Sequence, residues 1–366
     1  MSNIVISGYY GSKNAGDEAM LAAMIEVLSD MEPKVNITVI SADPEDTVKR
    51  HGVKAVSWMN FGEIIGALRR ADILLSGGGS LLQNVTSVRS LYYYLAIIWL
   101  AQFLNKPVML YAQGIGPIYG RLARRIMRYI GNRVSFITVR DKGSREEIES
   151  LGIDKPVLEV TADPVLAIHP VDCSIGRKIL TKNKAAGAKP TVGICVREWR
   201  EWEYYKDVLA VAADRIVDEF DARVIFVPMQ YPEDVKTAEI IVKKCKKPMT
   251  MLDGEYTTAE LMSVIGNFDL LISIRLHALI FAGVMGVPMI GISYDPKIDR
   301  FMDSIGEKSV GTLQDISAEG LLNEVRRKWN YREEFQKKNN ELMGRLRVLA
   351  TKNAEVALEL IKISHK

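Results

Sequence analysis

The chain has 366 residues, of which 48% are hydrophobic and 25% charged, and its formal net charge at pH 7 is +3. This length exceeds one ordinary hydrophobic core, so two domains of similar size are expected. The small net charge, with no tail of like charges, argues against nucleic-acid binding. Three widely spaced cysteines, Cys173, Cys195 and Cys245, indicate free thiols in a reducing compartment and argue against a disulfide framework or a zinc site.

The N-terminal segment, residues 1–7, reads directly as a strand, without a basic region followed by an apolar segment and a cleavage site. We therefore expect a cytoplasmic protein. The longest apolar segment, residues 91–104, is shorter than the roughly 20 residues that cross a bilayer, so a buried helix is expected there. Residues 121–130 form a basic amphipathic helix. Its basic face is either simply solvated or, as the alternative, makes a peripheral contact with the inner face of the cell membrane.

Strands and helices alternate through the first half of the chain, which is typical of a parallel, doubly wound sheet. Helices are expected at residues 17–28, 61–70 and 144–151. The expected strands are residues 4–7, 35–40, 72–76, 108–112, 136–139 and 158–160.

The turn after the first strand, residues 8–18, is rich in glycine and ends in residues that cap helices well. The spacing of Gly8 and Gly11 does not fit the dinucleotide-binding fingerprint. Asn14 and Asp17 have two open interpretations. They are either plain helix caps or groups that hydrogen-bond the hydroxyls of a sugar.

Two further glycine-rich turns, residues 76–80 with Gly79 and residues 113–117 with Gln113, follow later strands. Consecutive glycines let a ligand approach the backbone closely, although they also serve tight turns. Arg140 follows another strand and pairs with Asp141, faces solvent or binds an anion. We expect these turns to converge on one edge of the sheet and to bind substrate.

A second alternating set begins after an exposed link at residues 182–188, with strands at 191–196, 223–227, 270–274 and 289–293 and helices at 205–220, 235–244 and 258–265. We therefore predict an N-terminal Rossmann-like domain at 1–175 on the acceptor side and a C-terminal one at 190–315 on the donor side. Helices in 316–366 should pack back on the first domain. Two Rossmann-like domains facing a central cleft form the α/β arrangement called GT-B.

The segment 268–285 reads as a strand, a turn and a helix that ends at Gly286. Arg275 and His277 would then lie at the carboxyl end of a strand and at a helix N-terminus, where backbone amides and the helix dipole favour anions. With an unperturbed pKa of about 6.5, His277 can exchange a proton near neutrality. We predict that it is catalytic.

Arg197 and Lys297 follow neighbouring strands and would join this corner in one cationic pocket. For Arg275 the alternative is an ion pair with Asp269 or Asp295. The sequence contains no dense carboxylate cluster or His-x-x-His pair, so we expect a reaction without a metal.

Together, these motifs resemble those of the polysaccharide pyruvyl transferase family, and most of all those of its bacterial CsaB type. Each motif alone is unspecific, but the ordered set is specific and extends over almost the whole chain. The motifs are Gly8-Tyr9-Tyr10-Gly11, Asn14-x-Gly16-Asp17-Glu18, Gly77-Gly78-Gly79, Gln113-Gly114-x-Gly116-Pro117, Val139-Arg140-Asp141, Ala162-Asp163-Pro164 and Ile274-Arg275-Leu276-His277-Ala278.

The resemblance implies a GT-B-like fold and transfer of the enolpyruvyl group of phosphoenolpyruvate onto two sugar hydroxyls, giving a cyclic pyruvate ketal and phosphate. The CsaB type implies N-acetylmannosamine in a lipid-linked disaccharide as acceptor, for a secondary cell-wall polymer that anchors surface-layer proteins. It also places donor binding on Arg140, His277 and Lys297, with Arg197 as a further candidate, and the acceptor near Asn14 and Asp17. No cofactor is implied beyond phosphoenolpyruvate as donor substrate.

In this hypothesis His277 is the proton donor and Asp17 the base for an acceptor hydroxyl. Two alternatives stay open. A GT-B nucleotide-sugar glycosyltransferase would use the same fold but release a nucleoside diphosphate, and a noncatalytic carbohydrate-binding or scaffold protein would need neither His277 nor Lys297. The sequence does not specify the hydroxyl pair, the stereochemistry of the ketal or the oligomeric state.

Overall fold

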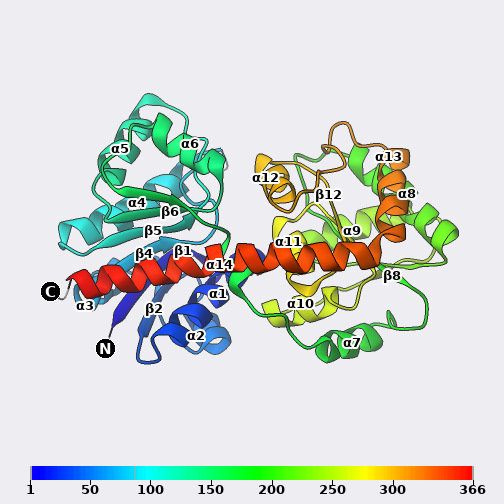
Figure 1. Cartoon of the computed structure of the whole chain (residues 1–366), viewed down its shortest axis with the longest axis horizontal. Helices are drawn as coiled ribbons and strands as arrows, with labels where there is room; N and C mark the ends of the chain where they lie inside the picture. Colours follow the sequence, from blue (N-terminus) through cyan, green and yellow to red (C-terminus); the bar gives the residue numbers. More distant parts are fainter. Residues whose placement is uncertain (1, 86, 365–366) are drawn as a thin grey trace. The chain divides into compact units, whose positions relative to one another are not determined.

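The computed structural model describes residues 2–85 and 87–364, without the side chains of residues 332, 333 and 336. The described chain divides into two compact units (Figure 1). The first unit comprises residues 2–13, 17–168 and 345–364, and the second comprises residues 14–16 and 169–344. These boundaries differ from the expected ranges 1–175, 190–315 and 316–366.

The boundary falls earlier than expected because helix α7 (Cys173–Lys182) packs on helix α10 (Thr258–Ile265) of the second unit. The backbone N–H of Gly176 donates to Ser263 Oγ at 2.7 Å. A Cβ on Gly176 would overlap the backbone of Ser263, so only glycine allows this close approach. The residues before the expected link are therefore part of the second unit.

The first unit contains a parallel sheet of seven strands in the order β3-β2-β1-β4-β5-β6-β7. Chain order reverses between β1 and β4, and open α/β sheets keep their ligands at such a switch point. Its strands are β1 (Asn3–Tyr10), β2 (Asn36–Ser41), β3 (Lys54–Ser57), β4 (Ile73–Gly77), β5 (Val108–Gln113), β6 (Phe136–Val139) and β7 (Val157–Val160). Its helices are α1 (Ala15–Met31), of which Ala15 and Gly16 belong to the second unit, α2 (Pro44–His51), α3 (Phe61–Arg70), α4 (Val88–Phe103), α5 (Arg121–Gly131), α6 (Lys142–Ser150), the 3-10 turn η1 (Pro164–Ala167) and the end of α14 (Arg332–Ser364).

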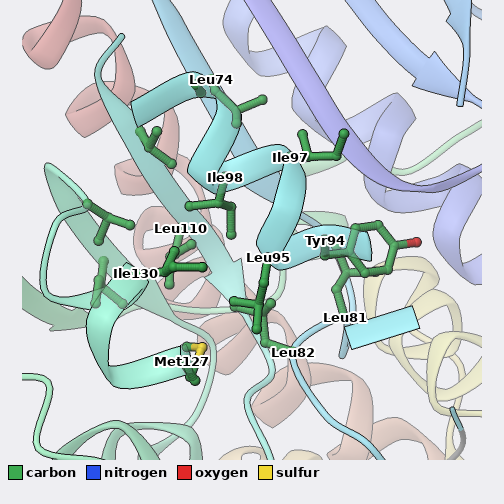
Figure 2. Packing of buried hydrophobic residues seen from close by; sticks show 14 of the residues in the cluster. Leu74, Leu81, Leu82, Tyr94, Leu95, Ile97, Ile98, Leu110, Met127 and Ile130 are labelled. Atoms are coloured by element: carbon green, nitrogen blue, oxygen red, sulfur yellow. The ribbon is translucent and has the colours of Figure 1, made fainter. Parts of the chain in front are cut away.

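Both faces of this sheet are covered, as a parallel sheet with apolar strands requires. One face packs under α3 to α6, where Leu95 and Ile98 of α4 meet Met127 and Ile130 of α5 (Figure 2). The other face packs against α1 and the end of α14. That end is fixed by Asn353, which is fully buried and whose Oδ1 accepts a hydrogen bond from Thr161 at 2.8 Å. The expected packing of the C-terminal helix on the N-terminal sheet is confirmed.

The second unit has a five-stranded parallel sheet in the order β10-β9-β8-β11-β12, again with a reversal, here between β8 and β11. Its strands are β8 (Thr191–Cys195), β9 (Arg223–Phe226), β10 (Thr250–Met251), β11 (Leu270–Ser273) and β12 (Met289–Gly291). Its helices are α7, α8 (Tyr204–Phe220), α9 (Glu233–Lys244), α10, α11 (Leu276–Met285), α12 (Pro296–Ser304), α13 (Ala318–Asn330) and the first part of α14.

The predicted strand, turn and helix around His277 is confirmed as β11 and α11. All four strand residues are buried. Helix α11 starts after Arg275 and ends at Gly286, which has a left-handed φ of 73°. The three cysteines are free thiols. Among the described helices, none combines the length and hydropathy needed to cross a membrane.

Candidate functional site

Arg275 braces the corner between β11 and α11. Its guanidinium forms an ion pair and hydrogen bond with Asp234, and donates to Gln230 Oε1 at 3.2 Å. Asp234 is fully buried, and its carboxylate also accepts the backbone N–H groups of Met229 at 3.0 Å and Gln230 at 2.9 Å. A buried carboxylate needs such partners, and Arg275 supplies the charge.

The alternative prediction, that Arg275 forms an ion pair with Asp269 or Asp295, is therefore wrong. Asp269 accepts the backbone N–H of Thr191 at 2.8 Å, and Asp295 caps helix α12. Both carboxylates accept backbone N–H groups within the second unit, from Thr191 and Lys297.

His277 lies in the first turn of α11, packed against the short segment Asn14–Gly16 of the same unit. A Cβ on Gly16 would overlap the imidazole Nδ1, so glycine is required for this packing. The segment is fixed by an antiparallel bridge between Asn14 and Gln230 and by a 2.9 Å hydrogen bond from Ala15 N to Met229 O. The structure thus brings together three predicted site residues, Asn14, Arg275 and His277. Asn14 Oδ1 accepts the N–H of Gly16 at 3.0 Å, which leaves both of its interpretations open.

Arg197 and Lys297 both lie against Tyr294, a residue that was not predicted from the sequence. Arg197 Nη1 donates to the phenol oxygen, and its guanidinium lies 4.3 Å from the centre of the Tyr294 ring. Lys297 Nζ lies 5.1 Å from the same ring centre, and Trp199 packs against the ring at 4.8 Å. Tyr294 comes directly before the Asp295-Pro296 helix start, but the position of its hydroxyl depends on packing that the sequence does not show.

These groups are electrostatically coupled. Burial lowers the pKa of Arg197, and the nearby charge of Arg275 lowers it further, while Tyr294 opposes both. Burial alone would raise the pKa of the Tyr294 phenol, but Lys297 and Arg197 outweigh it and hold that pKa below its ordinary value. The Nε of Arg197 is buried and has no hydrogen-bond partner among the described residues. This cluster is suited to binding an anion.

A hollow of about 290 Å³ adjoins this cluster and is lined in part by Trp199, Trp202 and Tyr294. The loops that follow β8 and β12 provide these side chains. Aromatic walls next to cations suit a ligand with both an apolar face and negative charge.

In the first unit, the structure brings together the predicted residues Asp17 and Gly79. Gly78 and Gly79 have left-handed φ angles of 80° and 88°. A Cβ on Gly79 would lie 3.1 Å from Asp17 Oδ1, and a Cβ on Gly78 would meet the hydroxyl of Tyr10 at 2.6 Å. The glycines therefore let the turn after β4 pass directly beside the first turn of α1.

Arg140 and Gln113 are held inside the first unit. The side chain of Arg140 is 7% exposed, with Nη1 2.7 Å from Asp163 Oδ2 and Nη2 3.0 Å from Ser80 Oγ. Its contact with the expected partner Asp141 is longer, at 4.0 Å. Gln113 is fully buried and donates to Ser76 O at 2.9 Å. Both side chains fix the loops at the carboxyl ends of β4 to β6, and their substrate-binding roles stay predictions.

In the described part of the chain, no group of three or more His, Cys, Asp or Glu side chains is placed to hold a metal ion.

Two parallel sheets, each with a reversed strand order, make this an α/β protein of the GT-B class. Solved structures support the fold. The S. aureus MnaA–UDP complex is 12% identical with a TM-score of 0.65, covering 93% of this chain and 91% of that one. Anabaena HepE in complex with UDP-glucose is 13% identical with a TM-score of 0.60, covering 100% and 98%. At this identity the likeness concerns the fold alone.

The chain belongs to the polysaccharide pyruvyl transferase family, whose model matches residues 14–296. It is also 23% identical over 280 residues to the amylovoran biosynthesis protein AmsJ of Erwinia amylovora. That match covers 70% of this chain and 66% of the relative, just under two thirds of its length.

Proposed function

We propose that the protein transfers the enolpyruvyl group of phosphoenolpyruvate onto two hydroxyls of N-acetylmannosamine in a lipid-linked disaccharide, as in the CsaB type. The products are a cyclic pyruvate ketal and phosphate. The ketal would serve a secondary cell-wall polymer that anchors surface-layer proteins, and the enzyme would work in the cytoplasm at the inner face of the cell membrane. Family membership supports the reaction class.

The observation that carries the donor assignment is the cluster of Arg197, Tyr294 and Lys297 at the carboxyl ends of β8 and β12, with His277 after the intervening strand β11. Phosphoenolpyruvate has a carboxylate and a phosphate, and needs several cations. Two guanidinium or ammonium groups and the N-termini of α11 and α12 supply positive potential at one sheet edge. Arg275 is neutralised by Asp234 and so acts as a brace.

In the proposed mechanism, His277 as imidazolium gives its proton to the methylene carbon of the donor, which becomes the methyl group. Positive charge then develops at C2, where the first sugar hydroxyl attacks. The C2–O bond to phosphate breaks, with Lys297 and Arg197 stabilising the departing anion. The second hydroxyl closes the ring at C2. Of the two hydroxyl protons, one restores the imidazolium, and the other is taken up by the proposed base, Asp17, and passes from it to the released phosphate, so the reaction balances.

Asp17 is proposed as the base for one acceptor hydroxyl, with Asn14 binding the sugar. The Asp17 carboxylate lies in the first turn of α1, next to the α-carbon of Gly79. A carboxylate in this position can act as a general base toward a hydroxyl that loses its proton in the transition state.

Incubation with phosphoenolpyruvate and an aryl N-acetylmannosamine disaccharide tests the proposal, with phosphate release and the mass of the ketal product as readouts. Lys297→Met should lower kcat/KM by about 10²- to 10³-fold, because it removes a charge that stabilises the leaving group. Lys308→Met, a change at an exposed lysine of the same unit, is the matched control and should leave the rate unchanged.

A parallel incubation with a nucleotide sugar tests the alternative. Release of a nucleoside diphosphate, with no ketal from phosphoenolpyruvate, would show a glycosyltransferase and overturn the proposal.

A further inference from the structure

One part of the first unit is almost free of acidic residues. Residues 64–140 contain ten Lys or Arg and a single acidic residue, Asp72, whereas the rest of the chain has 38 basic and 44 acidic residues. Asp72 is used internally, since its Oδ2 accepts the backbone N–H of Asn3 at 2.7 Å. Arg124 and Arg140 pair with carboxylates outside this segment, Glu147 and Asp163, and the segment still keeps an excess of basic residues.

Helix α4, in the middle of this region, is apolar on its outer face as well as its inner one. Its inner face packs on the sheet and on α5 through residues such as Leu95 and Ile98 (Figure 2). On the outer face Val88 is 50%, Trp99 47% and Phe103 69% exposed, and the Trp99 and Phe103 rings stack with centres 5.6 Å apart. A globular helix normally turns polar residues to water, so this face is suited to a partner that is not water.

Helix α5 supplies the charge beside it. The two helices are joined near their C-terminal ends by a 3.0 Å hydrogen bond from Gln102 Nε2 to Ile130 O. Arg121, Arg125 and Arg128 on α5 are exposed. Leu122 and Tyr129 are also exposed, at 63% and 53%, and the guanidinium of Arg133 lies 3.6 Å from the centre of the Tyr129 ring.

The apolar surface continues past α4 on its other side. Tyr93 Oη donates to the carbonyl of Trp58 at 3.0 Å, and the two rings meet edge to face at 5.6 Å. Trp58 is 43%, Met59 73% and Phe61 49% exposed. Exposed aromatic and apolar side chains thus extend from the start of α3, across α4, to the basic face of α5.

We infer that this surface, defined by Trp99, Phe103, Leu122, Arg125, Tyr129 and Arg133, binds an anionic lipid bilayer. Tryptophan and tyrosine favour the membrane–water interface, and arginines beside them attract anionic headgroups. An acidic protein or a nucleic acid would match the charge but would not need the apolar row on α4. The inference gives a membrane-docking surface to an enzyme whose proposed acceptor is linked to a lipid. Only the biological purpose of this surface rests on the proposed function.

Sedimentation with vesicles tests the inference, using the full chain at low salt without donor or acceptor. Vesicles of phosphatidylcholine are compared with vesicles that also contain phosphatidylglycerol. We expect binding to the anionic vesicles only, weakening as salt is raised. Trp99→Ala/Phe103→Ala and Arg121→Glu/Arg125→Glu should each lower the partition coefficient about tenfold or more, because one removes the inserted rings and the other reverses the attracting charge.

The matched control is Ile175→Ala/Lys178→Glu, an exposed apolar residue and an exposed lysine on α7 of the other unit. It should bind as the parent does. Equal loss in this control, or no preference for the anionic vesicles, would overturn the inference. The inference would also be overturned if the protein bound a soluble polyanion as strongly as it binds the vesicles, and if Trp99→Ala/Phe103→Ala did not weaken binding to that polyanion.

Turnover of the water-soluble aryl acceptor is measured separately on the same variants. Intact turnover with lost vesicle binding is the expected result. Lost vesicle binding therefore reports on the surface, and lost ketal formation reports on the proposed reaction.

Discussion

At the scale of single residues, Tyr294 joins the two cations that the sequence places on separate loops. It accepts a hydrogen bond from Arg197, and Lys297 lies above its ring. A phenol in this position keeps the two cations in place while still allowing each to bind an anion through its other N–H groups. Tyr294 therefore acts as a positioning residue for the proposed donor site.

The lowered pKa of Tyr294 gives a testable pH dependence. Its burial favours the neutral phenol, but Lys297 and Arg197 favour the phenolate more strongly, so the phenol should ionise below the ordinary value of about 10. Lys297→Met removes one of these charges and should raise the pKa. The measurement is the ultraviolet phenolate signal of the parent minus that of Tyr294→Phe, followed against pH. A difference signal that appears only above the ordinary range, or that Lys297→Met does not shift, would contradict this assignment.

The sequence was sufficient to predict that Arg197, His277 and Lys297 follow neighbouring strands of one parallel sheet, because these strands read as buried apolar segments. That the three side chains form one pocket stays a prediction. The sequence was insufficient for Arg275. Its partner Asp234 lies on α9, 41 residues earlier in the chain, and the pairing depends on how the first turn of α9 meets the residue that follows β11. Gly16 was missed as a positioning residue for the same reason, since its contact with His277 joins distant parts of the chain.

At the scale of elements, the predicted strands were correct where apolar, β-branched residues are buried on both faces. β6 was predicted with its observed bounds, and β5 to within one residue. β3 and β10 were missed because they contain few apolar residues, whereas the edge strand β7, with the sequence Val-Leu-Glu-Val, was predicted although none of its residues is buried. Helix α7 was missed, and the expected link was placed just after it.

Helix α13 allows a prediction about stability. Lys328 is 4% exposed and pairs with Glu307 at 2.8 Å, and Arg327 reaches the same carboxylate at 3.0 Å. Burial opposes ionisation of Glu307, but these two cations outweigh it and hold the pKa of Glu307 below its ordinary value. Glu307→Gln should lower the free energy of unfolding at neutral pH by about 3 kcal/mol, because it leaves a buried lysine without its carboxylate.

The sign of the pH dependence follows from the lowered pKa. Stabilisation by Glu307 is complete above its unfolded pKa and is lost as the pH falls through its lower, folded pKa. Denaturant unfolding of the parent and Glu307→Gln at several pH values should therefore show a difference that is constant near neutrality and shrinks in acid. The exposed Glu146→Gln is the control and should show almost no difference. A difference that grows in acid would contradict the pairing.

At the scale of the whole molecule, each compact unit contains a sheet with a reversed strand order and a set of chemical groups at the carboxyl ends of its strands. The first unit supplies glycine turns, Asp17 and the basic, aromatic surface of α4 and α5. The second supplies His277 and the cluster of Arg197, Tyr294 and Lys297.

The measurement that tests the central claim most directly is the reaction run in D₂O with phosphoenolpyruvate and the aryl acceptor, with the ketal methyl group observed by NMR. Protonation of the donor methylene by an exchangeable acid predicts a methyl group that carries one deuterium, and His277→Ala should form it about 10²- to 10⁴-fold more slowly. A product without a new methyl group, or a folded His277→Ala variant that works at the parent rate, would contradict the account.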